Sequence, residues 1–152
     1  MATYSRQIRD ALLSAAAATG HLSSVQGHDI VPAAPSGISA SMVLTKQFTV
    51  PARSGLQVTS MALVFLMRLS TNAMSEPRSD IDLRLLDAQD ALILAYHGDL
   101  DLGYTGACVD VLGMSGIPLG SDSGYTTVDK FLMRSFDLTI PVIIDDVWGQ
   151  TR

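Results

Sequence analysis

His97, Asp99 and Asp101 place one imidazole and two carboxylates in a single short segment, and these are ligand types that divalent metals accept. Their spacing matches neither a zinc-binding motif nor the Asp-x-Asp-x-Asp-Gly calcium loop. Polar residues are also common where a helix ends, and a predicted helix ends at His97. We therefore interpret the segment as a polar loop, and the sequence predicts no metal site.

Serines and histidines raise the question of a Ser-His-Asp site, because His21 and His28 flank a serine-rich connector. Such a site needs a strained nucleophile turn of the Gly-x-Ser-x-Gly type. Gly120–Gly124 has an aspartate in the middle, and Gly113–Gly116 lacks the second spacer. The whole stretch Gly113–Gly124 contains no lysine and opens no helix, unlike a phosphate-binding loop. The sequence thus predicts no catalytic residue, no cofactor and no enzyme activity.

The sulfur-containing residues are interpreted as packing residues rather than ligands. Cys108 is the only cysteine and lies in a short predicted strand without a neighbour that would activate it as a nucleophile, so we predict a small core residue. A single cysteine cannot form an internal disulfide, which favours synthesis in a reducing cytosol. Met61, Met67 and Met133 occupy strand positions and are predicted to fill the core or an interface.

Composition indicates one domain, residues 1–152, that is poor in charge. Charged residues make up only 16% of the chain, against about 25% in a typical soluble domain. A small domain with few charges leaves apolar area on its surface, and such area marks protein interfaces. The formal net charge of −5 argues against a nucleic-acid binder, which needs a basic patch.

The distribution of apolar residues disfavours two further classes of protein. The segment that begins at Met1 has no long apolar core of the signal-peptide type. The longest apolar run, Met61–Met67, is far too short to span a bilayer. We therefore expect a protein that is neither secreted by a signal peptide nor embedded in a membrane.

Periodicity predicts the elements of the first half of the chain. Tyr4–Thr19 carries an alanine-rich apolar stripe at helical spacing, and Leu22–Gly37, with its prolines, glycines and serines, is a predicted connector. Ile38–Val50 and Leu56–Ser70 are predicted strands, and Pro51–Gly55 between them has turn composition, so we expect a long hairpin. Both alternate sets of the second strand are largely apolar, which predicts burial on both of its faces.

The second half is predicted to contain one helix and two strands. Ser75–His97 has a strong apolar stripe, and a proline fits its first turn. Ala107–Leu112 is a short predicted strand, and the glycine-dense Gly113–Tyr125 is a predicted flexible excursion. From Leu132 to Ile144, every second residue is apolar except for one arginine, the pattern of a long strand with one buried face.

The resulting order is helix-strand-strand-helix-strand-strand. It contains no internal repeat and no alternation of strands with helices. This order is typical of an α+β fold, and we expect an antiparallel β-sheet with two helices packed on one face.

The second predicted helix carries more apolar residues than one core can cover. Leu83, Leu86, Ile93 and Leu94 lie well off its main stripe, and only a narrow face is charged. A helix that is apolar over most of its circumference is buried on more than one side. We therefore predict that these four residues form an oligomer interface with a neighbouring protomer.

Two residues are candidates for contact with a different partner. Trp148 is the only tryptophan and lies after the apolar part of the last strand. It is either a lid on the domain's own core or an interface anchor, because tryptophan is enriched at binding hot spots. Arg53 lies at the predicted hairpin tip and is either a solvated turn residue or a contact to a neighbouring protein.

The layout resembles the tail terminator proteins of long-tailed bacteriophages. The resemblance covers most of the chain and lies in Ile8–Leu13 of the first helix, the hairpin Ile38–Ser70, the amphipathic Ser75–His97 and Asp137–Val142 near the end. It rests on layout and size, because the family has no motif that can be carried over residue by residue. The glycine-rich Gly113–Gly124 departs from a minimal member of the family.

The resemblance implies a six-membered ring of α+β subunits that caps the tail tube and stops its polymerisation. The implied partners are other copies of the chain, the major tail tube protein and the head-side connector. DNA would pass through an acidic or neutral lumen without being held. The implied location is the head–tail junction of the virion, after synthesis in the cytoplasm of the bacterial host. Another head–tail joining protein of the neck or stopper kind, and a small α+β module that binds a ligand, remain as alternatives.

Overall fold

The protein is a mixed α+β molecule with two helices and a curled six-stranded sheet, seen in a computed structural model. The structure describes residues 3–27, 37–51, 54–55, 58–74, 77–97, 102, 106–128 and 130–149, with only the backbone of 3, 148 and 149. The elements are α1 (Thr3–Ala18), β1 (Ser24–Gln26), β2 (Ser39–Thr49), β3 (Val58–Asn72), η2 (Arg78–Asp80), α2 (Ile81–His97), β4 (Ala107–Val109), β5 (Gly120–Val128) and β6 (Phe131–Gly149).

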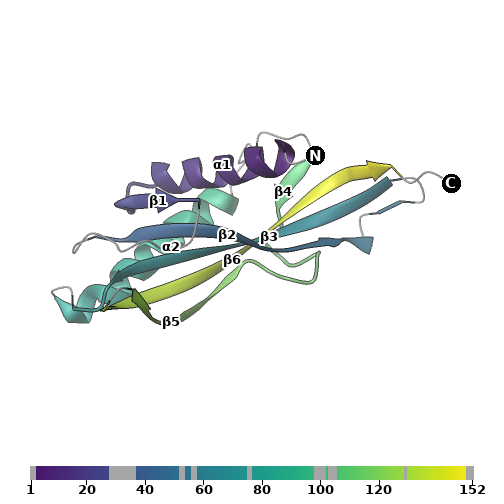
Figure 1. Ribbon diagram of the computed structural model, residues 1–152. Coiled ribbons are helices and arrows are strands. Elements are labelled where there is room, and N and C mark those ends of the chain that lie inside the picture. Colours follow the sequence, from purple (N-terminus) through teal and green to yellow (C-terminus); the bar gives the residue numbers. More distant parts are fainter. Residues whose placement is uncertain are drawn as a thin grey trace.

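Strands β3 and β6 form the centre of the sheet (Figure 1). They pair antiparallel from Val58 opposite Gly149 to Asn72 opposite Met133. The strand order is β1-β2-β3-β6-β4, and β5 pairs with β6 as well, beyond the short β4. The predicted hairpin of β2 and β3 is confirmed, and so is the long closing strand. The sheet is antiparallel except for the parallel pair of β1 and β2.

The sequence-based order lacks two strands. The segment Leu22–Gly37, predicted as a connector, contains β1. The prediction of a flexible loop for Gly113–Tyr125 is wrong from Gly120 onward, because β5 begins there. Strand β5 is poor in apolar residues and is half-exposed along its length, so its composition gave no strand signal. Its backbone pairs with β6 from Gly120 to Val128, and this tertiary pairing overrides the weak local preference.

The start of the second helix also differs from the expectation. The α-helix begins at Ile81, and the 3-10 turn η2 precedes it, so the predicted start at Ser75 is too early. Pro77 at the head of η2 has an extended backbone and makes no side-chain capping bond. The carboxylate of Asp82 in the first turn of α2 accepts a hydrogen bond from Arg134.

One large core joins both helices to alternate residues of the strands. It contains Ile8 and Leu12 of α1, Leu85 and Leu92 of α2, and inward-facing side chains of β2, β3 and β6. The hydroxyl of buried Tyr96 on α2 donates a hydrogen bond to the carbonyl of Leu12 at 3.0 Å, and burial raises the pKa of this phenol. The two helices are therefore connected through a polar contact as well as through the core.

The opposite side of the central strands is buried in part. A second cluster contains Val50, Ala62 and Ile143, with Phe48 packed against it. Every residue of β3 from Ser60 to Phe65 is buried, which confirms the prediction from the two apolar sets. The methionines Met61, Met67 and Met133 are buried as predicted.

Candidate assembly surface

The outer side of α2 presents three leucines to solvent. Leu83 is 59% exposed, Leu86 41% and Leu94 75%. At about 100° per residue, Leu83 and Leu94 lie opposite the side on which α2 packs into the main core. They are 11 positions apart, or about 16 Å along the helix axis at 1.5 Å per residue. The three leucines are thus spread along the outer side of α2, and the described part of the chain leaves them uncovered.

The fourth predicted interface residue has a different environment. Ile93 is half-buried and packs against the main core of its own chain. Exposed Asp87 and Asp90 lie between Leu83 and Leu94 on the outer side of α2. The outer face of α2, which we define as Leu83, Leu86, Asp87, Asp90 and Leu94, is therefore apolar with an acidic middle.

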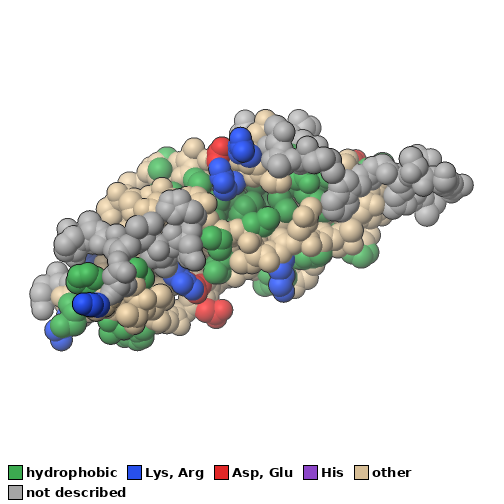
Figure 2. All heavy atoms as spheres, in the orientation of Figure 1, with side chains coloured by type: hydrophobic (Ala, Val, Ile, Leu, Met, Phe, Trp, Pro, Cys, Tyr) green, Lys and Arg blue, Asp and Glu red, His purple; other side chains and the backbone are tan. Residues whose placement is uncertain are grey.

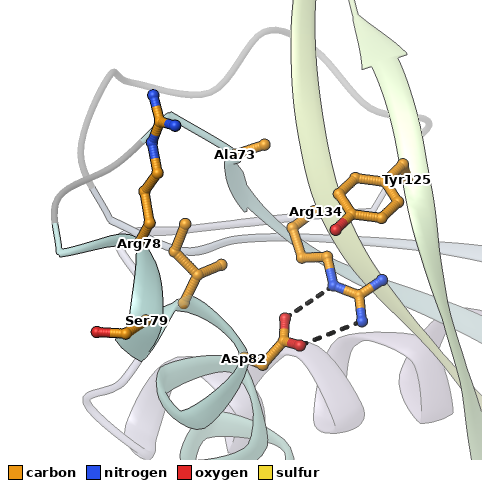
Figure 3. A pocket seen from close by; sticks show the side chains of 7 residues that line it. Ala73, Arg78, Ser79, Asp82, Tyr125 and Arg134 are labelled. Atoms are coloured by element: carbon orange, nitrogen blue, oxygen red, sulfur yellow. Dashed lines mark hydrogen bonds and ion pairs between the residues drawn. The ribbon is translucent and has the colours of Figure 1, made fainter.

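The beginning of α2 is attached to the hairpin of β5 and β6 through one arginine (Figure 3). The Nε atom of Arg134 on β6 donates to Oδ1 of Asp82 at 2.8 Å, and an Nη1 hydrogen bond reaches the carbonyl of Gly124 at 3.1 Å. The guanidinium carbon lies 4.7 Å from the ring centre of Tyr125 and 5.5 Å from that of Phe136. The hydrogen bonds from Arg134 hold the pKa of Asp82 below its usual value. The site is therefore a structural junction between hairpin and helix.

A cavity of about 270 Å³ opens beside this junction. Figure 3 shows Arg78 on η2 extending away from the ion pair, with Tyr125 on the far side of Arg134. The same end of the molecule carries exposed large apolar residues, namely Met74, Tyr125, Phe131 and Leu132. Figure 2 shows hydrophobic and basic side chains gathered at the end where α2 begins, at the lower left. The cavity is bordered by the Arg134–Asp82 ion pair and by the stacked Tyr125, and exposed apolar side chains lie nearby. This combination suits contact with the surface of another protein.

A second arginine lies on the opposite side of the central strands. Arg68 on β3 faces Asp137 on β6 in register and binds it through two hydrogen bonds of 2.7 and 3.0 Å. The pair is about 30% exposed, and Arg68 lines a hollow together with Ser41, Val43 and Leu66. Sequence reasoning missed both arginines. The available signal was a charged residue inside an otherwise apolar strand, which marks a position with a specific partner.

Cys108 is not the core residue that the sequence predicted. It lies on β4 opposite Ile143, and its side chain is exposed. Strand β4 is only three residues long and pairs with β6 alone, so its outward side chains lack a covering layer among the described residues.

Several predicted site residues lie outside the described residues. Arg53 falls there entirely, as do Asp99 and Asp101 of the polar loop. Trp148 belongs to β6 and its backbone pairs with Thr59, but its side chain is outside the description. His97 ends α2, is exposed, and its Nδ1 lies 3.0 Å from the carbonyl of Ile93.

Within the described ranges, no three His, Cys, Asp or Glu side chains are grouped so that they could hold a metal ion. Neither described helix has the length and apolar character needed to cross a membrane. No protein-family model matches the chain, and no curated protein matches it significantly.

Proposed function

We propose that the chain is a structural subunit that assembles into a ring and caps the tail tube of a bacteriophage. The observation that carries the proposal is the outer face of α2, where Leu83, Leu86 and Leu94 are exposed along one helix. Single exposed leucines are ordinary on a protein surface, but a row of them on a charge-poor domain marks an interface. Covering this row against another copy removes it from water.

The proposal includes how the helices lie on the sheet and how the subunits are arranged in the ring. Both helices cover one face of the sheet, and the subunits stand side by side around a central channel. The ring stops tube polymerisation on one side and meets the head-side connector on the other. The chain's net charge of −5 supports a channel wall that repels phosphates, so that DNA passes without being bound. The ring then acts at the head–tail junction of the virion, after synthesis in the bacterial cytoplasm.

The ligand-binding alternative has less support. The cavities lined wholly by described residues measure about 270, 210 and 220 Å³. Sites for drug-sized ligands usually enclose about 300–1,000 Å³ and are mainly apolar. A neck or stopper subunit would form the same kind of ring through the outer face of α2. Only a functional assay, such as the arrest of tube growth, separates such a subunit from a terminator.

Native mass and tube assembly test the proposal in two steps. Native mass spectrometry should give about six times the 16.2 kDa of one chain, and negative-stain images should show rings. Added to polymerising tube protein of the same phage, the ring should stop elongation, and tubes should grow without limit when it is omitted. A monomer at micromolar concentration would refute ring assembly. A ring that leaves tube growth unchanged but binds the connector would favour the neck alternative.

A further inference from the structure

The loop between β4 and β5 holds two large apolar side chains in water on a fixed backbone. Asp110 is only 4% exposed, and its carboxylate accepts hydrogen bonds from the amides of Gly113, Met114 and Ser115 at 3.1, 2.8 and 2.7 Å. Despite this order, Leu112 is 89% exposed and Met114 is 58% exposed. The loop therefore fixes apolar side chains in an outward position, as a preformed contact surface does.

These side chains border an apolar groove of about 220 Å³. The residues that line it are Cys108, Val109, Asp110, Val111, Leu112, Met114 and Ile143. It is smaller than the usual site for a drug-sized ligand, and it suits a single aliphatic side chain. The one carboxylate in its lining, that of Asp110, already accepts hydrogen bonds from three amides, so an apolar occupant would not leave this carboxylate without partners.

Cys108 and Ile143, which line the groove, face the side of the sheet opposite the main core into which α2 packs. Cys108 pairs in register with Ile143, and successive side chains of a strand point to opposite sides. Val142 and Ile144 belong to the main core with the buried residues of α2, whereas Ile143 belongs to the second cluster. The outer leucines of α2 point away from that main core. One protomer therefore cannot place its own leucine in its own groove.

We propose that the groove of one protomer receives a leucine from the outer face of α2 of the next protomer, with Leu94 as the principal residue. This inference rests on the proposed ring function and names the two halves of its interface. A protrusion and a groove on different sides of one chain form a heterologous contact, which closes into a ring when the rotation between subunits fits. Leu94 is the most exposed of the three leucines, and Asp87 and Asp90 can stay hydrated at the rim of the contact.

The native Cys108 allows a direct test, because it lies in the groove and is the only cysteine of the chain. Leu94→Cys should form disulfides between neighbours under mild oxidation and give a ladder of covalent oligomers up to the ring number. Leu83→Cys and Leu86→Cys test the other leucines in the same way. The double variant Leu94→Cys/Cys108→Ser should give no ladder. Leu44→Cys is the matched control, because Leu44 is 51% exposed and belongs to β2 rather than to α2.

Alkylation of Cys108 provides a second measurement on the unmodified chain. In the wild-type ring, maleimide should react with Cys108 about tenfold or more slowly than in a monomeric Leu94→Asp variant, because thiol reactivity follows access. Rapid alkylation in an intact ring overturns the inference. So does a ring in which none of the three α2 variants gives a ladder, an intramolecular disulfide in place of the ladder, or an equal ladder from Leu44→Cys. These results leave the ring function standing, whereas a monomeric wild type refutes both proposals.

Discussion

Arg134 on β6 and Asp82 in the first turn of α2 form an ion pair that joins residues 52 positions apart in the chain. Their closest contact, from Nε to Oδ1, measures 2.8 Å, and a second from Nη2 to Oδ2 measures 3.4 Å. The same guanidinium stacks on Tyr125 of β5 and on Phe136 of β6. The pair thus fixes the β5–β6 hairpin relative to α2, whose outer face carries the proposed interface.

The two partners of this ion pair should contribute unequally to stability. Asp82→Ala should lower the free energy of unfolding by less than about 1 kcal/mol, because the side chain is 56% exposed and exposed ion pairs contribute little. Arg134→Ala should cost about 1–2 kcal/mol, because the ring contacts and the packed stem are lost as well. Urea unfolding measures both values, with Arg9→Ala of the exposed Arg9–Asp10 pair as control. Equal costs for Asp82→Ala and Arg134→Ala would show that stacking adds nothing.

The central part of the fold follows from the sequence because its signal is strong and local. In β6, each even-numbered residue from Phe136 to Ile144 is buried in the main core, as the period of two predicts. Strand β3 is apolar in both alternate sets and is buried on both sides over its middle. Buried strand positions require apolar residues, so the spacing of apolar residues predicts β3 and β6 correctly.

Elements that depend on distant pairing were missed. Strand β5 has a polar sequence and exists because its backbone bonds to β6, and β1 is a three-residue strand added in parallel to β2. Lys130 adopts a φ of 107° at the turn between β5 and β6, a conformation that its residue type does not favour. The partners of Arg134, Arg68 and Asp110 likewise come from other segments or from loop geometry, and periodicity does not predict them.

A charge on the outer face of α2 should break the ring without unfolding the subunit. Leu83→Asp/Leu94→Asp places two carboxylates at exposed positions, so the monomer should lose less than about 1 kcal/mol of stability. Inside an interface each buried charge costs several kcal/mol, so the ring should dissociate. Size-exclusion chromatography with light scattering measures the assembly, and Leu44→Asp serves as control. An intact ring in the double variant would exclude α2 from the interface.

Ile93 is unsuited to that test, although the sequence places it with the other three residues. Its side chain packs against the core of its own chain, so Ile93→Asp should destabilise the monomer itself. Thermal unfolding should show a lower melting temperature for Ile93→Asp than for Leu94→Asp. Similar values for the two variants would mean that the core tolerates the charge at this position.

The assembled protein should bind DNA weakly at every salt concentration. The net charge of −5 opposes the counterion release on which nonspecific DNA binding depends. Fluorescence anisotropy with a labelled duplex should show no saturable binding at micromolar protein in 50 mM salt, whereas nonspecific DNA binders have dissociation constants of about 10⁻⁴–10⁻⁶ M at physiological salt. Tight binding that weakens steeply with salt would contradict the proposed DNA channel.

Protonation of Asp110 should release the loop between β4 and β5. Burial raises the pKa of Asp110, but the hydrogen bonds from Ser115, Met114 and Gly113 outweigh burial and leave this pKa below its usual value. A carboxyl group with a lowered folded pKa stabilises the fold fully above its unfolded pKa of about 3.9. That contribution is lost as the pH falls through the folded pKa. The loop should therefore be fixed at neutral pH and loosen in acid.

Asp110→Asn isolates this contribution, because it keeps the size of the side chain and removes the charge. At neutral pH the variant should be less stable than the wild type by about 1.5–3 kcal/mol, the usual range for hydrogen bonds to a charged group. Urea unfolding at decreasing pH should show the difference shrinking from about pH 4, near the unfolded pKa, down through the lower folded pKa, where the wild-type carboxyl becomes protonated as well. A pH-independent difference would assign the effect to altered packing. Hydrogen exchange gives the local readout: the amides of Gly113, Met114 and Ser115 should be protected in the wild type and should exchange faster in Asp110→Asn, because each donates to this carboxylate.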